Sequence, residues 1–190
     1  MINFPKTTLL YNHNIYAAPK ITPKLAITAT NTNINCFGGT WHSLVEDHTP
    51  NDVNGYMMLV NASLTPRDFY VDTIIGLCAN TTYEFSAWIV NVLKNTSCLS
   101  NPARPKLVSN IETVTGTVLG TFTTADILEN ASPQWQQYGL FFRTPNNTNN
   151  IVLRITNNGP GGCGNDIALD DITFKPCGPK VTTSVLNTNQ

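Results

Sequence analysis

The sequence predicts an all-β fold, a two-sheet antiparallel β-sandwich of the jelly-roll type, and three observations lead to this prediction. Short runs of Val, Ile, Thr, Tyr, Phe and Trp recur along the chain and are separated by turn residues. In residues 82–92, Tyr83, Phe85 and Ala87 alternate with Glu84 and Ser86, which is the period of two of a sheet. No amphipathic helix of useful length separates the runs, which favours a sandwich over an α/β fold.

The remaining runs divide the chain into expected elements. The further strands are predicted at residues 57–60, 69–77, 114–122, 135–143, 151–156 and 167–174. One helical turn is predicted at 124–128, because an Asp stands near its start. Residues 1–35 are a weaker region of one or two edge strands. The pattern therefore predicts a single domain at 1–179, followed by a Thr- and Asn-rich linker at 180–190 that leads to a neighbouring domain.

The low charge of the chain limits its partners. Only 12% of the 190 residues are charged, against about 25% in a typical soluble domain, and the formal net charge is -1. The 11 Lys and Arg residues are scattered, which argues against nucleic acid, whose backbone is bound by clustered basic residues. No apolar stretch approaches the roughly 20 residues of a membrane span, so we expect no membrane insertion. Residues 1–10 do not resemble a signal peptide, and we expect the native protein to begin further upstream.

Five cysteines indicate an oxidising compartment. They are Cys36, Cys78, Cys98, Cys163 and Cys177. None forms a C-x-x-C pair and none has zinc-finger spacing to a His. Disulfides are therefore the leading interpretation, with free buried thiols as the alternative, and they predict a secreted or cell-surface protein. The odd number leaves one thiol over.

Three stretches, at residues 47–62, 76–88 and 159–172, carry a resemblance to a known family. The second stretch contains the motif T-Y-x-F-S-x-W at 82–88, and the third contains D-I-A-L-D-D-I at 166–172. The motif W-x-x-Y-x-x-x-F stands between these two stretches, at 135–142. In combination, over about residues 36–179, they resemble the galactose-binding-like jelly-roll modules of Bacteroidetes-type surface and secreted proteins. Those modules are similar to carbohydrate-binding modules and to MAM-type domains. The resemblance implies two antiparallel sheets, a structural calcium in many members and often a carbohydrate ligand.

The resemblance also implies a disulfide map. In such modules the last strand pairs antiparallel with the strand that begins near Thr82. The ends of these strands then match as Cys78–Cys177 and Cys98–Cys163. Bonding between Cys163 and Cys177 is disfavoured, because the strand between them holds them far beyond the about 7 Å limit on Cα separation. Cys36 is left as a buried thiol or as the partner of a residue upstream.

Asp170 and Asp171 are the first candidates for a metal site. Two carboxylates beside apolar residues in a strand are costly unless a cation or donors compensate them. Counting along the strand puts Asp170 on the inward face with Ala168 and Ile172, and the related modules carry a calcium-binding Asp here. We therefore predict a structural calcium ion; the alternative is that Asp170 accepts backbone hydrogen bonds at a strand kink.

The other metal ligands are less defined. The related modules supply them from an N-terminal Asn-Gly-x-Phe-Glu type motif, which this chain lacks. Glu46 and Asp52, which lie close together in the sequence, are candidates in its place. Asp166, in the Gly-rich segment before the last strand, is a third.

Aromatic residues are the candidates for carbohydrate binding, because an aromatic ring stacks on the apolar face of a sugar. Trp41 stands in a Gly-flanked, loop-like segment with His42 beside it, and it is the first candidate. Tyr56 and Tyr70 are weaker ones. The two other tryptophans, Trp88 and Trp135, are expected to pack in the sheets.

The sequence predicts no enzyme. His42 and His48 are six residues apart, whereas a zinc protease needs two His at helical i, i+4 spacing. No Gly-x-Ser-x-Gly segment occurs, and no pair of carboxylates suggests a glycosidase. We expect a carbohydrate-binding or adhesion module of a larger protein, with carbohydrate and neighbouring domains as partners. The alternative is a ligand-free spacer domain stabilised by disulfides and calcium.

Overall fold

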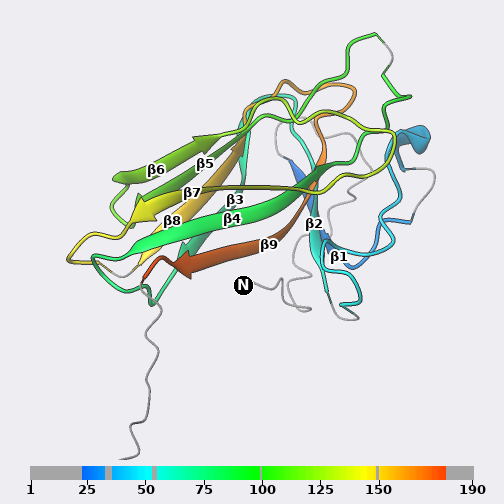
Figure 1. The fold of residues 1–190 in the computed structure, drawn as a ribbon. Coiled ribbons are helices and arrows are strands. Elements are labelled where there is room, and N and C mark those ends of the chain that lie inside the picture. Colours follow the sequence, from blue (N-terminus) through cyan, green and yellow to red (C-terminus); the bar gives the residue numbers. More distant parts are fainter. Residues whose placement is uncertain (1–22, 33–35, 53–54, 99, 149, 179–190) are drawn as a thin grey trace, which may run out of the picture.

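The computed structural model describes residues 23–32, 36–52, 55–98, 100–148 and 150–178. These residues form two antiparallel sheets packed face to face (Figure 1). The elements are β1 (Lys24–Thr28), the short 3-10 helix η2 (Cys36–Gly39), β2 (Met57–Asn61), β3 (Arg67–Ile74), β4 (Thr82–Asn91), β5 (Leu107–Thr113), β6 (Val118–Thr123), β7 (Gln136–Arg143), β8 (Ile151–Asn157) and β9 (Ile167–Pro176). In the described part of the chain, no helix has the length and apolar character needed to cross a membrane.

The strand order gives the fold its class. One sheet has the order β1-β2-β9-β4-β7 and the other the order β3-β8-β5-β6. The paired strands are antiparallel. The chain passes from one sheet to the other at every connection between successive strands except β1–β2 and β5–β6. The predicted all-β jelly roll is confirmed. The antiparallel pairing of β4 with β9, on which the expected disulfide map depended, is present as well.

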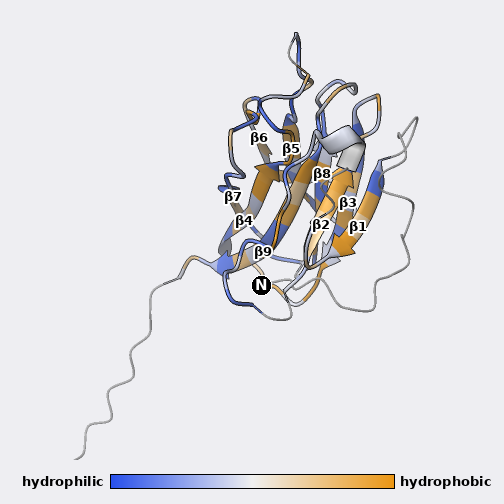
Figure 2. Ribbon diagram, turned by 90° about the vertical axis from the view of Figure 1, so that its right-hand side faces the viewer, coloured by the Kyte–Doolittle hydropathy of each residue, from blue (hydrophilic) through white to orange (hydrophobic). Residues whose placement is uncertain are grey.

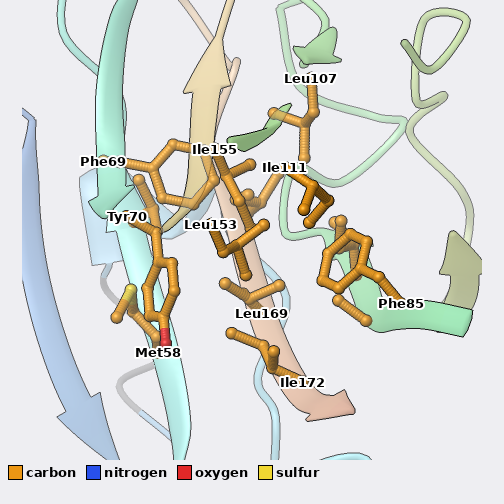
Figure 3. Packing of buried hydrophobic residues seen from close by; sticks show 14 of the residues in the cluster. Met58, Phe69, Tyr70, Phe85, Leu107, Ile111, Leu153, Ile155, Leu169 and Ile172 are labelled. Carbon is orange, nitrogen blue, oxygen red and sulfur yellow. The ribbon is translucent and has the colours of Figure 1, made fainter. Parts of the chain in front are cut away.

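The core lies between the two sheets. Alternate residues of each strand point into it, including Phe85 from β4, Ile111 from β5 and Leu153 from β8, whose side chains meet in Figure 3. Figure 2 shows the apolar residues concentrated along the strands. Full burial of each large aliphatic or aromatic side chain contributes about 1.5–3 kcal/mol, so this cluster is the main source of stability.

Two predicted elements are wrong. Residues 114–122 were expected to form one strand, but a turn interrupts them, in which the Thr113 N–H donates to the carbonyl oxygen of Thr117 and Gly116 has a φ of 89°. Residues 124–128 form no helix. The N–H of Ile127 instead donates to Pro105 O, because this segment runs alongside the chain that leads into β5.

A β-bulge in β9 overturns the inward placement of Asp170. The register with β4 shifts so that Trp88 faces Asp170 while Ser86 faces Thr173. Asp171 is the extra residue and has a φ of 48°. Counting by two from the end of the strand therefore fails at the bulge. Asp170 lies on the outer face of the sheet, with Trp88 and Ser86, and not in the core.

One of the two expected disulfides is present. Cys98 and Cys163 are bonded, with their Cα atoms 5.8 Å apart, and they join the loops that follow β4 and precede β9. The side chain of Cys36, which was expected to be a buried thiol or the partner of an upstream residue, lies outside the described part of the structure.

The second expected disulfide is wrong, because Cys78 and Cys177 are free, exposed thiols. Cys177 continues β9, and its N–H donates to Thr82 O over 2.7 Å. The carbonyl oxygen of Cys78 accepts a hydrogen bond from Thr144 Oγ1, just past the end of β7, over 2.6 Å. Since β4 lies between β9 and β7, these contacts hold the two cysteines on opposite sides of β4.

Candidate functional site

The candidate site lies on the outer face of the five-stranded sheet, which is the face turned away from the second sheet. Alternation along β4 puts Glu84, Ser86 and Trp88 on this face, while Phe85 and Ala87 enter the core. The face has two parts. A covered half lies under the segment 41–48, and an open half lies over β4 and β7.

The covered half buries Trp41. Its side chain is 1% exposed and packs on the outer apolar residues of β2, β4 and β9. Its Nε1 donates to Asp166 Oδ2 over 3.1 Å, and the N–H of Ala62 donates to Asp166 Oδ1 over 2.9 Å. Burial raises the pKa of Asp166 to about 7. The prediction that Trp41 contacts a glycan is wrong, because its ring is enclosed.

The other predicted carbohydrate ligands are dispersed. His42 is buried, its Nε2 lies 3.0 Å from Asn130 O, and desolvation lowers its pKa. Tyr70 is also buried and donates to Asp72 Oδ2, and burial raises its pKa. Tyr56 packs against the core. These side chains do not gather around one surface, so they do not form the predicted site.

The carboxylates of the bulge accept hydrogen bonds from the protein itself. Asp170 accepts the backbone N–H groups of His48, over 2.9 Å, and of Asp171, over 2.7 Å. Asp171 Oδ2 lies 2.8 Å from His48 Nδ1 and accepts the hydroxyl of Thr49 over 2.9 Å. Burial raises the pKa of Asp170 to about 6, and the negative charges of Asp171 and Asp47 add to the shift. This is the alternative interpretation, in which donors rather than a cation compensate Asp170.

The five predicted calcium ligands do not come together. Asp166 precedes Asp170 by four residues of β9, or about 13 Å of extended chain, while Glu46 and Asp52 are exposed. In the described ranges, no group of three or more His, Cys, Asp or Glu is placed to hold a metal ion. With both oxygens of Asp170 already accepting N–H groups, this arrangement does not fit calcium. The expectation of calcium from the sequence is untested, and chelation tests it.

We expect chelation to leave the stability unchanged. Because protein donors already satisfy Asp170 and Asp171, EDTA should shift Tm by less than about 2 °C. Differential scanning fluorimetry with and without EDTA measures this. A fall of more than about 5 °C that added CaCl2 reverses would show that a calcium site exists despite these hydrogen bonds.

An aromatic stack separates the two halves of the outer face. The His48 ring lies parallel to Trp88, with centroids 3.8 Å apart and planes 16° apart. Trp135 approaches the same imidazole edge-on at 5.8 Å. His48 and Trp88 are 40 positions apart along the chain, so no local pattern predicts this contact.

The open half contains a hollow of about 210 Å³ over β4 and β7. It is lined by Glu84, Ser86, Gln137, Tyr138, Gly139, Leu140 and Phe141. Position 139 requires glycine, since a Cβ there would lie 2.1 Å from the backbone Phe85 O of the paired strand β4. The Phe141 side chain is 67% exposed beside the hollow. Gln137 Nε2 donates to Ser86 Oγ over 3.0 Å, and Ser86 Oγ lies 2.9 Å from Thr173 Oγ1.

The hollow suits binding better than hydrolysis. An exposed ring, an amide, a hydroxyl and one carboxylate surround it, and glycoside hydrolysis requires two carboxyl groups flanking the bond. Sequence reasoning missed Phe141, although a signal was present. Two adjacent Phe in a strand must point to opposite faces, so either Phe141 or Phe142 had to lie outside the core.

Comparisons with known proteins establish the fold. No family model matches the chain, and no curated protein matches it. A cyclase from Fischerella sp. TAU is 14% identical, with a TM-score of 0.54 over 88% of this chain and 84% of that one. A CBM4 structure is 18% identical, with a TM-score of 0.43 over 88% of this chain and 99% of that one.

The chain also matches a part of a much longer protein. The enzymatically active domain of bacteriophage CBA120 tailspike protein 4 is 12% identical, with a TM-score of 0.44. The match covers 82% of this chain but only 19% of the tailspike chain. At these identities the likeness concerns architecture alone, so the class defined here is the two-sheet jelly-roll sandwich.

Proposed function

We propose that this chain is a carbohydrate-binding module of a larger extracellular protein, and that the glycan binds in the open half of the outer face. The observation that supports this most directly is the 67% exposed ring of Phe141 beside a polar hollow. Large apolar side chains that stand in a concave, partly polar surface are typical of ligand sites.

The residues of the hollow offer the contacts that a sugar requires. The Phe141 ring can stack on the C–H face of a pyranose, while Gln137, Ser86 and Glu84 can hydrogen-bond to its hydroxyls. The hydrogen bonds that join Gln137, Ser86 and Thr173 hold two of these groups in place before a ligand arrives. Such preorganisation lowers the entropic cost of binding.

Two further observations support the proposal, one for the extracellular setting and one for the class of ligand. The Cys98–Cys163 disulfide is typical of oxidising compartments. The low charge and the Asn- and Thr-rich composition leave few groups for binding nucleic acid, whereas they suit neutral polar ligands.

Loss of the Phe141 ring should weaken glycan binding at least tenfold, which corresponds to about 1.4 kcal/mol. A glycan array with the wild type identifies the ligand, and calorimetry then compares wild type with Phe141→Ala. Val71→Ala is the matched control, because Val71 is 51% exposed on β3 of the other sheet. Its affinity should equal that of the wild type.

Two outcomes would contradict the proposal. If the array shows no binding by the wild type, the ligand-free spacer domain becomes the better explanation. If Phe141→Ala binds as tightly as Val71→Ala, a glycan site exists elsewhere on the surface.

A further inference from the structure

The outer edge of β7 carries a row of backbone groups that pair with no described strand, and β6 of the other sheet lies beside it only near Phe141, whose O would be 3.8 Å from a Cβ at Gly120. In the β4–β7 ladder the N–H of Thr144 donates to Thr81 O, which sets the positions at which the two strands bond to each other. Because antiparallel ladders alternate, Gln137, Gly139 and Phe141 turn their N–H and C=O groups away from β4. In the described part of the chain, β7 is the last strand of its sheet, and no strand pairs with it on that side.

The other three sheet edges carry features that discourage strand pairing. β1 has only 5 residues and begins with Lys24. β3 carries Arg67, Asp68 and Asp72, and its ladder is interrupted by a register shift. β6 has 6 residues, and its ladder with β5 also contains a register shift. Short length, charge and bulges are the usual means by which natural sheets protect their edges.

β7 has none of these features. It is 8 residues long, its register with β4 shows no shift, and its only charged residue is Arg143 at the end. The exposed ring of Phe141 adds apolar surface to the same edge. A long, regular, uncharged edge is a template for another strand, so a protein that leaves one unprotected is expected to use it.

We propose that β7 pairs antiparallel with β7 of a second copy of this chain, which joins the two five-stranded sheets into one. The strand is complementary to itself in charge. Residues 136–142 are uncharged, and the antiparallel arrangement puts the two Arg143 residues at opposite ends of the pair. With a formal net charge of -1, two copies meet without strong repulsion.

One register fits the side chains as well as the backbone. When Gly139 faces its own copy, Phe141 faces Gln137 of the partner subunit, and the backbone groups of both residues point across the interface. The large ring then lies beside the amide of Gln137 of the partner subunit and diagonal to the partner's Gly139, which has no side chain. The proposal concerns this edge alone and holds whether or not the hollow binds a glycan.

Analytical ultracentrifugation from about 1 to 500 μM tests the pairing. All proteins carry Cys78→Ser and Cys177→Ser, so that the exposed thiols cannot link two chains. Gln136→Lys puts a charge on the edge at a residue that does not line the hollow, although it removes the acceptor of the Tyr138 hydroxyl. Phe141→Pro removes one outward N–H while keeping the bonds to β4. Val71→Lys, on an edge strand of the other sheet, is the control.

The expected result is a dimer for the wild type and for Val71→Lys, and at least tenfold weaker dimerisation for both β7 variants. Circular dichroism and Tm confirm that the variants are folded. A wild type that stays monomeric over the whole range overturns the proposal, as does a dimer that both β7 variants leave intact. Glycan binding retained by Gln136→Lys separates this result from the outcome for the proposed function.

Discussion

Removal of the Cys98–Cys163 disulfide is expected to lower Tm by roughly 8–16 °C. The bond closes a loop with a sequence separation of 65 residues. In the chain-entropy account, closure of such a loop destabilises the unfolded state by about 4 kcal/mol. For a domain of 150–250 residues, each kcal/mol shifts Tm by about 2–4 °C. Thermal unfolding of Cys98→Ala/Cys163→Ala, followed by circular dichroism, measures the loss.

The chain provides its own matched control for this experiment. Cys78→Ala/Cys177→Ala also removes two thiols, but these are free and exposed, so Tm should change by less than about 2 °C. Equal losses in the two double variants would contradict the assignment of the covalent link to Cys98 and Cys163.

The second large effect is a loss of stability as the pH rises from about 4 to about 7. Burial raises the folded-state pKa of Asp166 from 3.8 to about 7 and that of Asp170 from 3.8 to about 6. The folded protein therefore holds protons that the unfolded chain has released, and their stabilising contribution is full below pH 4 and lost by pH 7. Three pKa units at Asp166 correspond to about 4 kcal/mol at most.

His42 acts in the opposite direction. Desolvation lowers its pKa from 6.5, so its contribution to stability is lost as the pH falls below that value. Glu129, whose pKa is lowered by its hydrogen bond to Arg104, acts in the same direction as His42, while burial raises the pKa of Asp47 as it does for the other two aspartates. Because the raised aspartates have the larger shifts, we expect the net Tm to be higher at pH 4.5 than at pH 7.5. Thermal melts across this range at constant ionic strength measure the difference.

Asp166→Asn assigns the pH effect to one group. The variant has no proton to lose, so the fall in Tm between pH 4.5 and 7.5 should shrink markedly. Asp126→Asn, at an exposed position, should keep the wild-type slope. An unchanged slope in Asp166→Asn would show that the pH dependence originates elsewhere.

The parts of the fold that follow from local pattern were predictable. β4 and β9 were expected at nearly their observed positions, because apolar residues alternate along them. β5 was missed, since Ser109 and Asn110 interrupt its apolar residues. The bulge at Asp171 has no signal in the apolar pattern, because it is a backbone adjustment within the β4–β9 ladder. That single shift decided whether Asp170 lay in the core or outside it.

The candidate site was predictable to a lesser degree. Trp41 was expected on the surface because glycines precede it. Its indole N–H instead donates a hydrogen bond to Asp166, 125 residues later in the chain. The surface of the hollow depends on the close approach of the β4 backbone to Gly139 and on which of two adjacent Phe faces outward. Both are properties of the strand register, which only the folded sheet determines.

The position of β9 in its sheet has a mechanical consequence. β1 and β9 both run antiparallel to β2, which lies between them, so they are parallel to each other. Lys24 stands at the start of β1 and Pro176 at the end of β9, at opposite ends of the sheet. Tension applied between these two residues acts along the strands and loads the ladders in shear. Their hydrogen bonds then bear the force together, whereas peeling would break them one after another.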